Sequence, residues 1–117
     1  MKTEKTFRPG LFQFFGRKRR KKAYIAGKIG DLPIEVYTRK FLVAEDEVRK
    51  MGFAPVNPVS LPHNHGRTYW EYMREDVAEM LKCDVVYASR DWLDSPGAIK
   101  EVTIALDFRM KVIFQPL

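Results

Sequence analysis

The sequence predicts an α/β protein, a Rossmann-like three-layer sandwich with a parallel sheet of four to five strands. Short apolar runs alternate along the chain with longer segments in which apolar residues recur every 3.6 residues. This strict alternation implies right-handed crossovers, which place helices on both faces of the sheet. The 117 residues suffice for one domain, and a hydrophobic content of 45% is typical of folded globular proteins.

The first strand and helix are expected between residues 23 and 52. Ala23–Ala26 is an apolar run that ends at Gly27, which predicts a buried strand followed by a tight turn. Apolar residues then recur at helical spacing from Tyr37 to Met51, and this predicts a helix. Gly52 can adopt the left-handed conformation that ends many helices.

A short strand and a second helix follow. Phe53–Val56 predicts a strand at the edge of the sheet, because Pro55 cannot donate to a ladder of hydrogen bonds. A polar loop over residues 57–68 leads to a helix predicted over Tyr69–Lys82. We expect the apolar face of this helix to comprise Trp70, Met73, Val77, Met80 and Leu81.

The remaining elements are a strand, a helix and a final strand. Asp84–Ser89 reads as a buried strand, and Lys111–Phe114 as the last one. Ser95 is a good helix N-cap and Pro96 suits the first helical position, so the third helix is expected from there to Met110.

The net charge of +6 is concentrated at one end of the chain. Residues 1–22 hold nine of the 21 Lys and Arg residues, mostly in the run Arg17–Lys22, whereas residues 23–117 carry more acids than bases. We therefore interpret residues 1–22 as a flexible basic arm and residues 23–117 as the folded domain. The arm is either a solvated extension or a segment that contacts nucleic acid or another polyanion.

The cysteine content and the lengths of the apolar segments indicate the compartment in which the protein is found. The single cysteine, Cys83, cannot form an internal disulfide, and no segment has the roughly 18 to 20 consecutive apolar residues needed to cross a bilayer. We expect a cytoplasmic protein with no membrane span.

A parallel sheet of this kind binds ligands at the carboxyl ends of its strands, which directs attention to residues 27–33, 57–68 and 90–97. Glu101 follows the last of these segments and breaks its local pattern, because Ile104, Ala105 and Phe108 at helical spacing from it are apolar. A carboxylate on the buried face of a helix lowers the stability of the fold unless it is paired with another group or has a functional role. Glu101 is either a satisfied structural carboxylate or a functional one.

Other residues near the strand ends allow both structural and functional interpretations. Asp76 flanks the apolar face of its helix, and Ser95 and Gly97 open a helix whose free N–H groups could bind an anion. Tyr24 is a core tyrosine whose hydroxyl needs a partner, and Trp92 either stacks on a base or fixes its loop.

Two histidines, His63 and His65, flank Asn64 in the second loop. They lack a third ligand at metal-binding spacing, so we predict no metal site.

Four segments together resemble the nucleoside 2-deoxyribosyltransferase-like family, in particular its small phage and bacterial members. The resemblance also extends, more distantly, to 2′-deoxynucleoside 5′-monophosphate N-glycosidases. It covers nearly all of residues 23–117. The segments are YIAGKIG from Tyr24, VNP from Val56, HGRTYWEYMREDVAEMLKCDVV from His65 and DSPGAIKEVTIAL from Asp94.

The resemblance implies a flavodoxin-like fold and assigns roles to particular residues. Ser95, Gly97 and Glu101 fit the family's S-x-G-x-x-x-E pattern, in which the glutamate is the nucleophile. Asp76 corresponds to an aspartate that assists the leaving base, and Tyr24 to a tyrosine that holds the nucleophile or the sugar.

The first loop departs from the family pattern. The N-glycosidases carry serine and arginine there for a 5′-phosphate, whereas this chain has Lys28 and Gly30. We expect Gly27, Lys28 and Ile29 to contact substrate, together with Ser95, Gly97 and Trp92, but the phosphate requirement does not carry over.

The expected activity is cleavage or transfer at the N-glycosidic bond of a (deoxy)nucleoside or nucleotide, through a covalent glycosyl-glutamate and without a metal or organic cofactor. The alternative is a non-catalytic nucleotide-binding module with a polyanion-binding arm. The resemblance also implies a homo-oligomer, a dimer or larger.

Overall fold

The computed structural model describes residues 20–61 and 68–117, in which strands and helices alternate. The order of the elements matches the order predicted from the sequence. The strands are β1 (Lys22–Ala26), β2 (Ala54–Val56), β3 (Val85–Ala88) and β4 (Lys111–Phe114); the α-helices are α2 (Ile34–Lys50), α3 (Tyr69–Leu81) and α4 (Pro96–Asp107); the 3-10 helices are η1 (Pro58–Ser60) and η2 (Trp92–Asp94).

The four strands form one parallel sheet in the order β2-β1-β3-β4. Tyr24 of β1 pairs with Val56 on one side and with Val86 on the other. The chain leaves β1 toward one edge of the sheet and later continues on its other side, so the loops that follow β1 and β3 diverge and leave a crevice. The predicted α/β class is confirmed, and the strand order is that of a flavodoxin-like fold.

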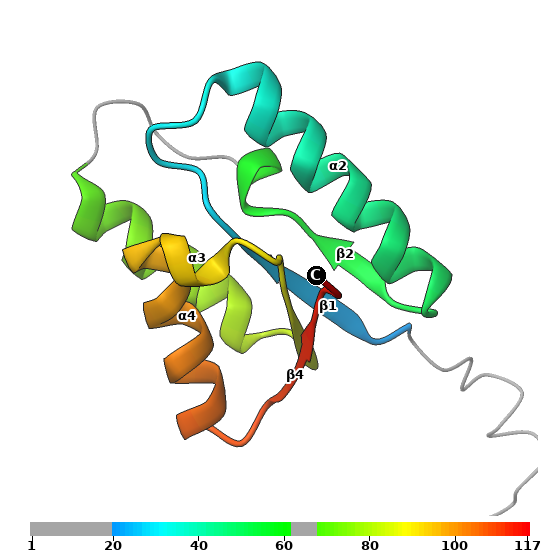
Figure 1. Ribbon diagram of the computed structural model, residues 1–117. Helices are drawn as coiled ribbons and strands as arrows, with labels where there is room; N and C mark the ends of the chain where they lie inside the picture. The colour runs from blue at the N-terminus through cyan, green and yellow to red at the C-terminus, as the bar shows by residue number, and fades with distance from the viewer. Residues whose placement is uncertain (1–19, 62–67) are drawn as a thin grey trace, which may run out of the picture.

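Alternate residues of the central strands face two separate hydrophobic cores. Ala23 and Ile25 of β1 pack with Phe41 and Val48 of α2 on one face of the sheet. On the other face, buried residues of β1 and β3 pack with residues of α3 and α4. Figure 1 shows the resulting layers, with α2 on one side of the sheet and α3 and α4 on the other. The members of the second core are Tyr24, Ala26, Met80, Cys83, Val86, Ala88, Val102 and Ala105.

Gly52 ends α2 as predicted. Its φ of 96° lies in the left-handed region that favours glycine. The Gly52 N–H donates to the carbonyl of Arg49, and the Phe53 N–H donates to the carbonyl of Val48 at 3.0 Å. These two bonds form a Schellman motif, which satisfies carbonyls at the helix end and turns the chain into β2 at the edge of the sheet.

The third predicted helix ends earlier than expected. It stops at Asp107 rather than Met110, because Arg109 adopts a φ of 64° and reverses the chain. Phe108 lies at the C-cap and is 65% exposed, so its predicted place on the buried stripe beside Glu101 is wrong. The buried residues of α4 are Ala98, Glu101, Val102 and Ala105.

Helix α3 begins at a capping box, and part of its expected apolar face lies exposed. The Glu71 N–H donates to Thr68 Oγ1 at 3.2 Å, and the Thr68 N–H donates to Glu71 Oε1 at 2.7 Å. Met80 is fully buried as predicted, whereas Trp70 is 59% exposed and Leu81 40% exposed, so the assignment of these two residues to the core face is wrong.

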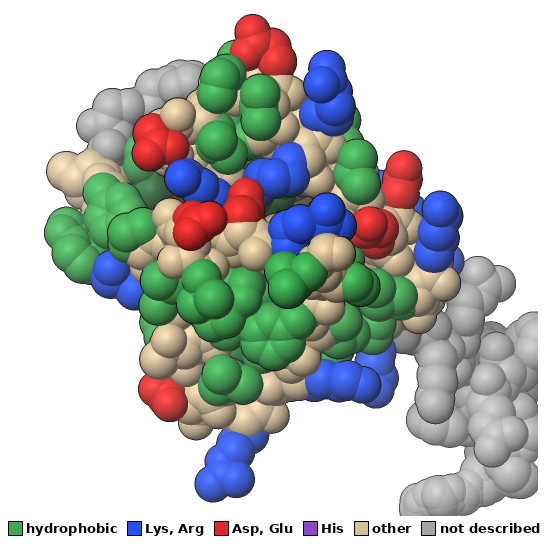
Figure 2. Space-filling model, viewed as in Figure 1, with side chains coloured by type: hydrophobic (Ala, Val, Ile, Leu, Met, Phe, Trp, Pro, Cys, Tyr) green, Lys and Arg blue, Asp and Glu red, His purple; other side chains and the backbone are tan. Residues whose placement is uncertain are grey.

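The chain enters the sheet through the end of its basic run. The Ala54 N–H donates to the Lys21 carbonyl and the Asp84 N–H to the Lys22 carbonyl, so β1 begins one residue earlier than expected. Most of the predicted arm, residues 1–19, lies outside the described residues, and its role stays a prediction. On the face in Figure 2, Lys and Arg side chains lie interspersed with Asp and Glu and form no continuous basic patch.

None of the described helices combines the length and the apolar character needed to span a bilayer.

Candidate active site

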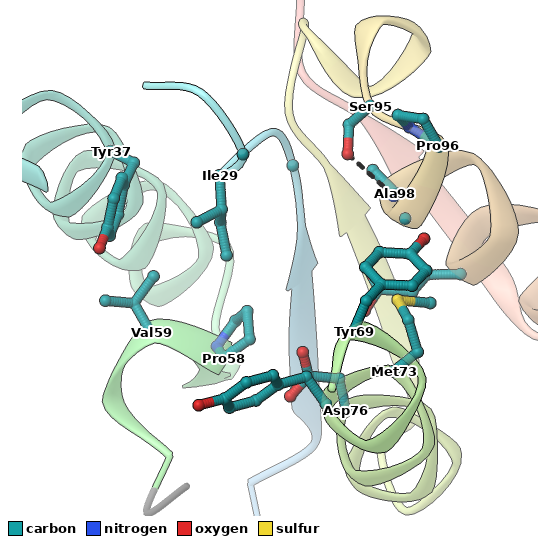
Figure 3. Close-up of a pocket in the computed structure, with 15 residues that line it drawn as sticks. Ile29, Tyr37, Pro58, Val59, Tyr69, Met73, Asp76, Ser95, Pro96 and Ala98 are labelled. Atoms are coloured by element: carbon teal, nitrogen blue, oxygen red, sulfur yellow. Dashed lines mark hydrogen bonds between the residues drawn. The ribbon is translucent and has the colours of Figure 1, made fainter. Parts of the chain in front are cut away.

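A cavity of about 490 Å³ lies at the carboxyl ends of the strands, where the fold predicts a ligand site. Its walls come from the segments after β1, β2 and β3 and from one side of α3. In Figure 3, Ile29, Tyr37, Pro58 and Val59 form one side of it, and Tyr69, Met73 and the start of α4 form the other. The charged residues among the described lining are Asp76 and Glu101.

The start of α4 places Glu101 at this cavity. Ser95 caps the helix, because its Oγ accepts a 3.1 Å hydrogen bond from the Ala98 N–H, and Pro96 occupies the first turn. Glu101 follows about one and a half turns later, on the face that also buries Ala98 and Val102. Its side chain lines the cavity, and the residue is only 6% exposed. The predicted placement of a carboxylate on the buried side of this helix is confirmed.

Tyr24 holds Glu101 from the sheet. The Tyr24 hydroxyl donates a hydrogen bond of 2.6 Å to Glu101 Oε2, and both residues are buried. Tyr24 is not part of the cavity lining, so it contacts Glu101 from the side of the sheet. Burial, followed by the negative charges of Glu101 and Asp76, raises the pKa of Tyr24 well above its ordinary value. Tyr24 therefore stays protonated and acts as a donor to the carboxylate.

Glu101 holds its proton more tightly than an ordinary glutamate. Burial raises its pKa, the Tyr24 hydrogen bond lowers it and the charge of Asp76 raises it, and the resulting pKa is about 8. At pH 7 the protonated form of Glu101 is therefore the major one. The ionised form becomes the major one only above the pKa.

Asp76 brings a second carboxyl group to the cavity from α3. The helix is fixed at its start by the capping box at Thr68 and later by the buried side chain of Met80. The two carboxyl groups influence each other electrostatically, as the effect of Asp76 on the pKa of Glu101 indicates. A cavity with two interacting carboxyl groups is suited to general acid-base or nucleophilic chemistry.

Four of the six residues predicted to bind substrate line the cavity, and two do not. Gly27, Ile29, Ser95 and Gly97 are part of the lining. Trp92 instead packs against the core beneath α4, and its ring centroid lies 5.6 Å from that of Phe114. For Trp92 the structure thus favours the loop-fixing alternative.

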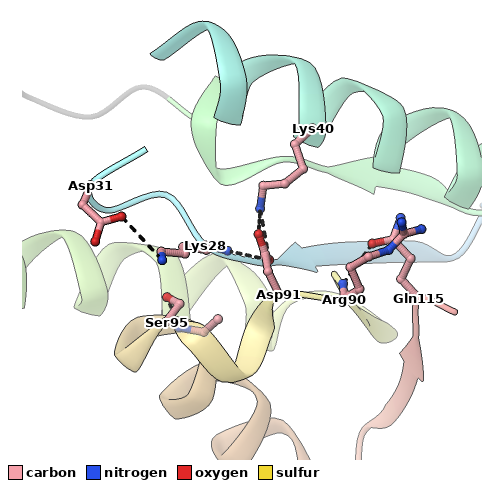
Figure 4. A network of polar contacts seen from close by, with 8 residues as sticks. Lys28, Asp31, Lys40, Arg90, Asp91, Ser95 and Gln115 are labelled. Carbon is pink, nitrogen blue, oxygen red and sulfur yellow. Dashed lines mark hydrogen bonds and ion pairs between the residues drawn. The ribbon is translucent and has the colours of Figure 1, made fainter. Parts of the chain in front are cut away.

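Lys28 takes part in a polar network beside the cavity (Figure 4). Its Nζ lies 3.5 Å from Asp31 Oδ1, and its backbone N–H donates to Asp91 Oδ1 at 3.2 Å. Asp91 also pairs with Lys40 Nζ of α2 at 2.9 Å. One carboxylate thus connects α2, the loop after β1 and the loop after β3, and so fixes the loop that carries Ile29.

The sequence reasoning missed the aromatic part of the lining. Tyr69, Tyr72, Met73 and Asp76 all line the cavity and share one face of α3. Their spacing of three, four and seven residues from Tyr69 is helical, so the periodicity contained this signal. Further lining residues that were missed include Tyr37, Pro58, Val59 and Ala98.

His63 and His65 lie outside the described residues, so the prediction that they bind no metal stays a prediction. In the two described ranges, no group of three or more His, Cys, Asp or Glu residues is arranged to hold a metal ion.

The fold and the cavity define a flavodoxin-like α/β protein with two carboxyl groups at the switch point of its sheet. Residues 21–114 match the family described as Domain of unknown function (DUF4406), and the chain belongs to this family. No curated protein matches the chain.

Proposed function

We propose that this protein cleaves or transfers the N-glycosidic bond of a (deoxy)nucleoside or nucleotide through a covalent intermediate on Glu101. The observation that carries the proposal is the position of Glu101, a buried carboxyl group that lines a cavity and accepts a hydrogen bond from Tyr24. The S-x-G-x-x-x-E pattern at Ser95, Gly97 and Glu101, shared with the nucleoside 2-deoxyribosyltransferase-like family, also supports it.

The chemistry requires a nucleophile on one side of the sugar and help for the departing base. Glu101 attacks C1′, so that an O–C1′ bond forms, the C1′–N bond breaks and its electron pair moves to the base. Asp76 assists the leaving base by donating a proton or by relaying one through the substrate. Water or a second base then attacks C1′, the ester bond to Glu101 breaks to regenerate its carboxylate, and Asp76 accepts the proton of the attacking group.

Tyr24 supports this reaction by holding one carboxylate oxygen. Its hydrogen bond goes to Glu101 Oε2, which leaves Oε1 as the oxygen that attacks the sugar. The bond also favours the ionised form of Glu101, which is the nucleophile. Because the pKa of Glu101 is about 8, the nucleophilic form increases as the pH rises through that value.

The size and lining of the cavity suit a nucleoside. A volume of about 490 Å³ falls within the roughly 300 to 1,000 Å³ of small-molecule sites. Tyr37, Tyr69 and Tyr72 line it and offer aromatic surfaces on which a base can stack.

The test is release of free base. Wild-type protein is incubated at pH 8.5 with a panel of ribo- and deoxyribonucleosides and their 5′-monophosphates, and the products are separated by chromatography. The Glu101→Gln variant should lose at least 100-fold in rate, whereas Asp107→Asn, an exposed change on the same helix, should keep wild-type activity. Mass spectrometry of a quenched reaction should detect the sugar covalently attached to Glu101.

Binding of a nucleoside or nucleotide without base release from any substrate would overturn the proposal. The non-catalytic nucleotide-binding module would then be the correct interpretation. The expected homo-oligomer is tested separately by light scattering of the full chain.

A further inference from the structure

Strand β4 lies at the edge of the sheet and is open on one side. The strand order is β2-β1-β3-β4, and within the described residues β4 pairs with β3 alone. The Gln115 N–H points toward β3, because it donates to the Ala88 carbonyl at 2.8 Å. Backbone groups alternate in direction along a strand, so the N–H and carbonyl groups of Val112 and Phe114 point to the open side. These groups can pair with a further strand.

Apolar side chains surround this open edge. Phe114 is 48% exposed and packs on Trp92, and the next residue, Leu93, is 65% exposed. Helix α4 packs beside β4 and also carries exposed apolar residues, Ile99 and Leu106. Figure 2 shows hydrophobic side chains gathered on this face of the molecule. An exposed apolar surface beside an open edge strand is typical of a protein interface.

The edge of β4 is suited to pairing with a copy of itself. We infer that two copies of this chain associate through β4, antiparallel and about a twofold axis, so that one sheet continues from copy to copy. The outward groups of Val112 in one copy then pair with those of Phe114 in the other, and the two Ile113 residues meet on the axis. Cross-strand pairs of aromatic and β-branched side chains stabilise a sheet. A twofold contact of this kind closes after two copies.

Charged residues favour a second copy of the chain as the occupant of the edge. Ile113 packs in the core beneath α2, so Lys111 and Gln115 also face the α2 side. In the proposed register Lys111 lies opposite Gln115 of the second copy. Gln115 Nε2 donates to Glu47 Oε1 at 2.9 Å, which brings Glu47 of the second copy within reach of the long Lys111 side chain. The twofold axis forms this pair of opposite charges twice.

The association is separate from the chemistry proposed for the cavity. The residues that line the cavity do not include those of β4 among the described lining. Failure of the dimer would therefore leave the proposed function standing, and failure of the proposed function would leave the dimer standing.

Light scattering of the full chain over a range of concentrations tests the inference. The wild type should have twice the chain mass of 13.7 kDa. Phe114→Lys places a charge in the centre of the interface and should raise the dimer dissociation constant by about tenfold or more. The matched control is Leu42→Lys on α2, where the native side chain is 50% exposed, and it should leave the dissociation constant unchanged.

Lys111→Glu tests the register through an exposed residue, and it remains informative if Phe114→Lys does not fold. The variant places a carboxylate near Glu47 of the second copy, so the dissociation constant should rise by about threefold or more at low salt and by less at high salt. Lys50→Glu makes the same charge change at an exposed position on α2 and should have no such effect.

Amide exchange followed by NMR locates the contact. The N–H groups of Val112 and Phe114 should exchange more slowly at high protein concentration than after dilution, because they are hydrogen-bonded only in the dimer. A monomeric wild type, or a dimer that neither Phe114→Lys nor Lys111→Glu weakens, would overturn the inference. Slow exchange of these two amides in a monomer would show that another segment of the same chain covers the edge, which would also overturn it.

Discussion

The hydroxyl group of Tyr24 lies 2.6 Å from Glu101 Oε2, although 77 positions separate the two residues in the chain. The contact joins the central strand of the sheet to the helix after β3. The hydrogen bond links the ionisation of Glu101, the proposed nucleophile, to the hydroxyl group of Tyr24, which is fully buried. This coupling gives the first prediction.

Tyr24→Phe should shift the pH dependence of base release. The Tyr24 hydrogen bond lowers the pKa of Glu101, so its loss raises that pKa and moves the rising limb of kcat/KM to higher pH. A hydrogen bond to a charged group is worth about 1.5 to 3 kcal/mol, so activity at pH 7 should fall by roughly 10- to 100-fold. A pH profile of both proteins measures the shift; a uniform loss with an unchanged midpoint would contradict it.

Glu101→Gln should flatten the dependence of stability on pH. The pKa of Glu101 is about 8 in the folded protein and about 4.5 ordinarily, so the folded state binds more protons between these values. The stability of the wild type is therefore full below about pH 4.5 and falls as the pH rises toward 8. At about 1.4 kcal/mol per pKa unit, this loss is on the order of 5 kcal/mol.

Urea denaturation of wild type and Glu101→Gln at intervals from pH 5 to pH 9 measures this effect. The difference between the two proteins isolates Glu101 from the other titrating groups. A constant difference over that range would show that Glu101 titrates normally.

Asp91→Asn should loosen the loop after β1. The change weakens the pairing with Lys40 Nζ and the bond from the Lys28 N–H, so amide exchange at Lys28 should become faster. The pair is partly exposed, so the free energy of unfolding should fall by only about 1 kcal/mol. Hydrogen exchange followed by NMR measures the loop, and Asp31→Asn, at a residue whose side chain is 80% exposed, is the matched control. Equal exchange in the two variants would argue against this role for Asp91.

Gly27→Ala and Gly30→Ala should differ in stability although both glycines lie in the same loop. A Cβ atom at Gly27 would lie 2.8 Å from Ser89 Oγ and 2.9 Å from Ser89 Cβ, and Ser89 is itself buried. A Cβ atom at Gly30 would meet nothing within 4 Å. We expect Gly27→Ala to lower the free energy of unfolding by about 1 to 3 kcal/mol, and Gly30→Ala to change it by less than about 0.5 kcal/mol. Thermal and urea denaturation would show whether the two variants differ.

Local patterns in the sequence were enough to predict the fold and the position of Glu101. Gly52 and Ser95 act within a few residues of themselves, so the ends that they define are visible in the sequence. Glu101 stands out because Ile104 and Ala105, three and four residues later in the helix, are apolar residues that pack in the core. In each case the determining interactions are local.

Contacts between distant segments could not be predicted in the same way. Periodicity does not show the pairing of Tyr24 with Glu101, which only the family resemblance implied, because it depends on how α4 packs on the sheet. The packing of Trp92 on Phe114 depends on β4 lying next to β3. Periodicity identifies the apolar face of a helix, but it does not show which neighbouring part of the structure that face packs against. For this reason the face of α3 that begins at Tyr69 was not recognised as part of the cavity.

The bonds from Ala54 and Asp84 to the carbonyls of Lys21 and Lys22 anchor the polypeptide at the amino ends of the strands. The cavity opens at their carboxyl ends, the length of a strand away, or about 15 Å. Anything tethered through the residues that precede Lys21 is therefore attached at the opposite pole of the sheet.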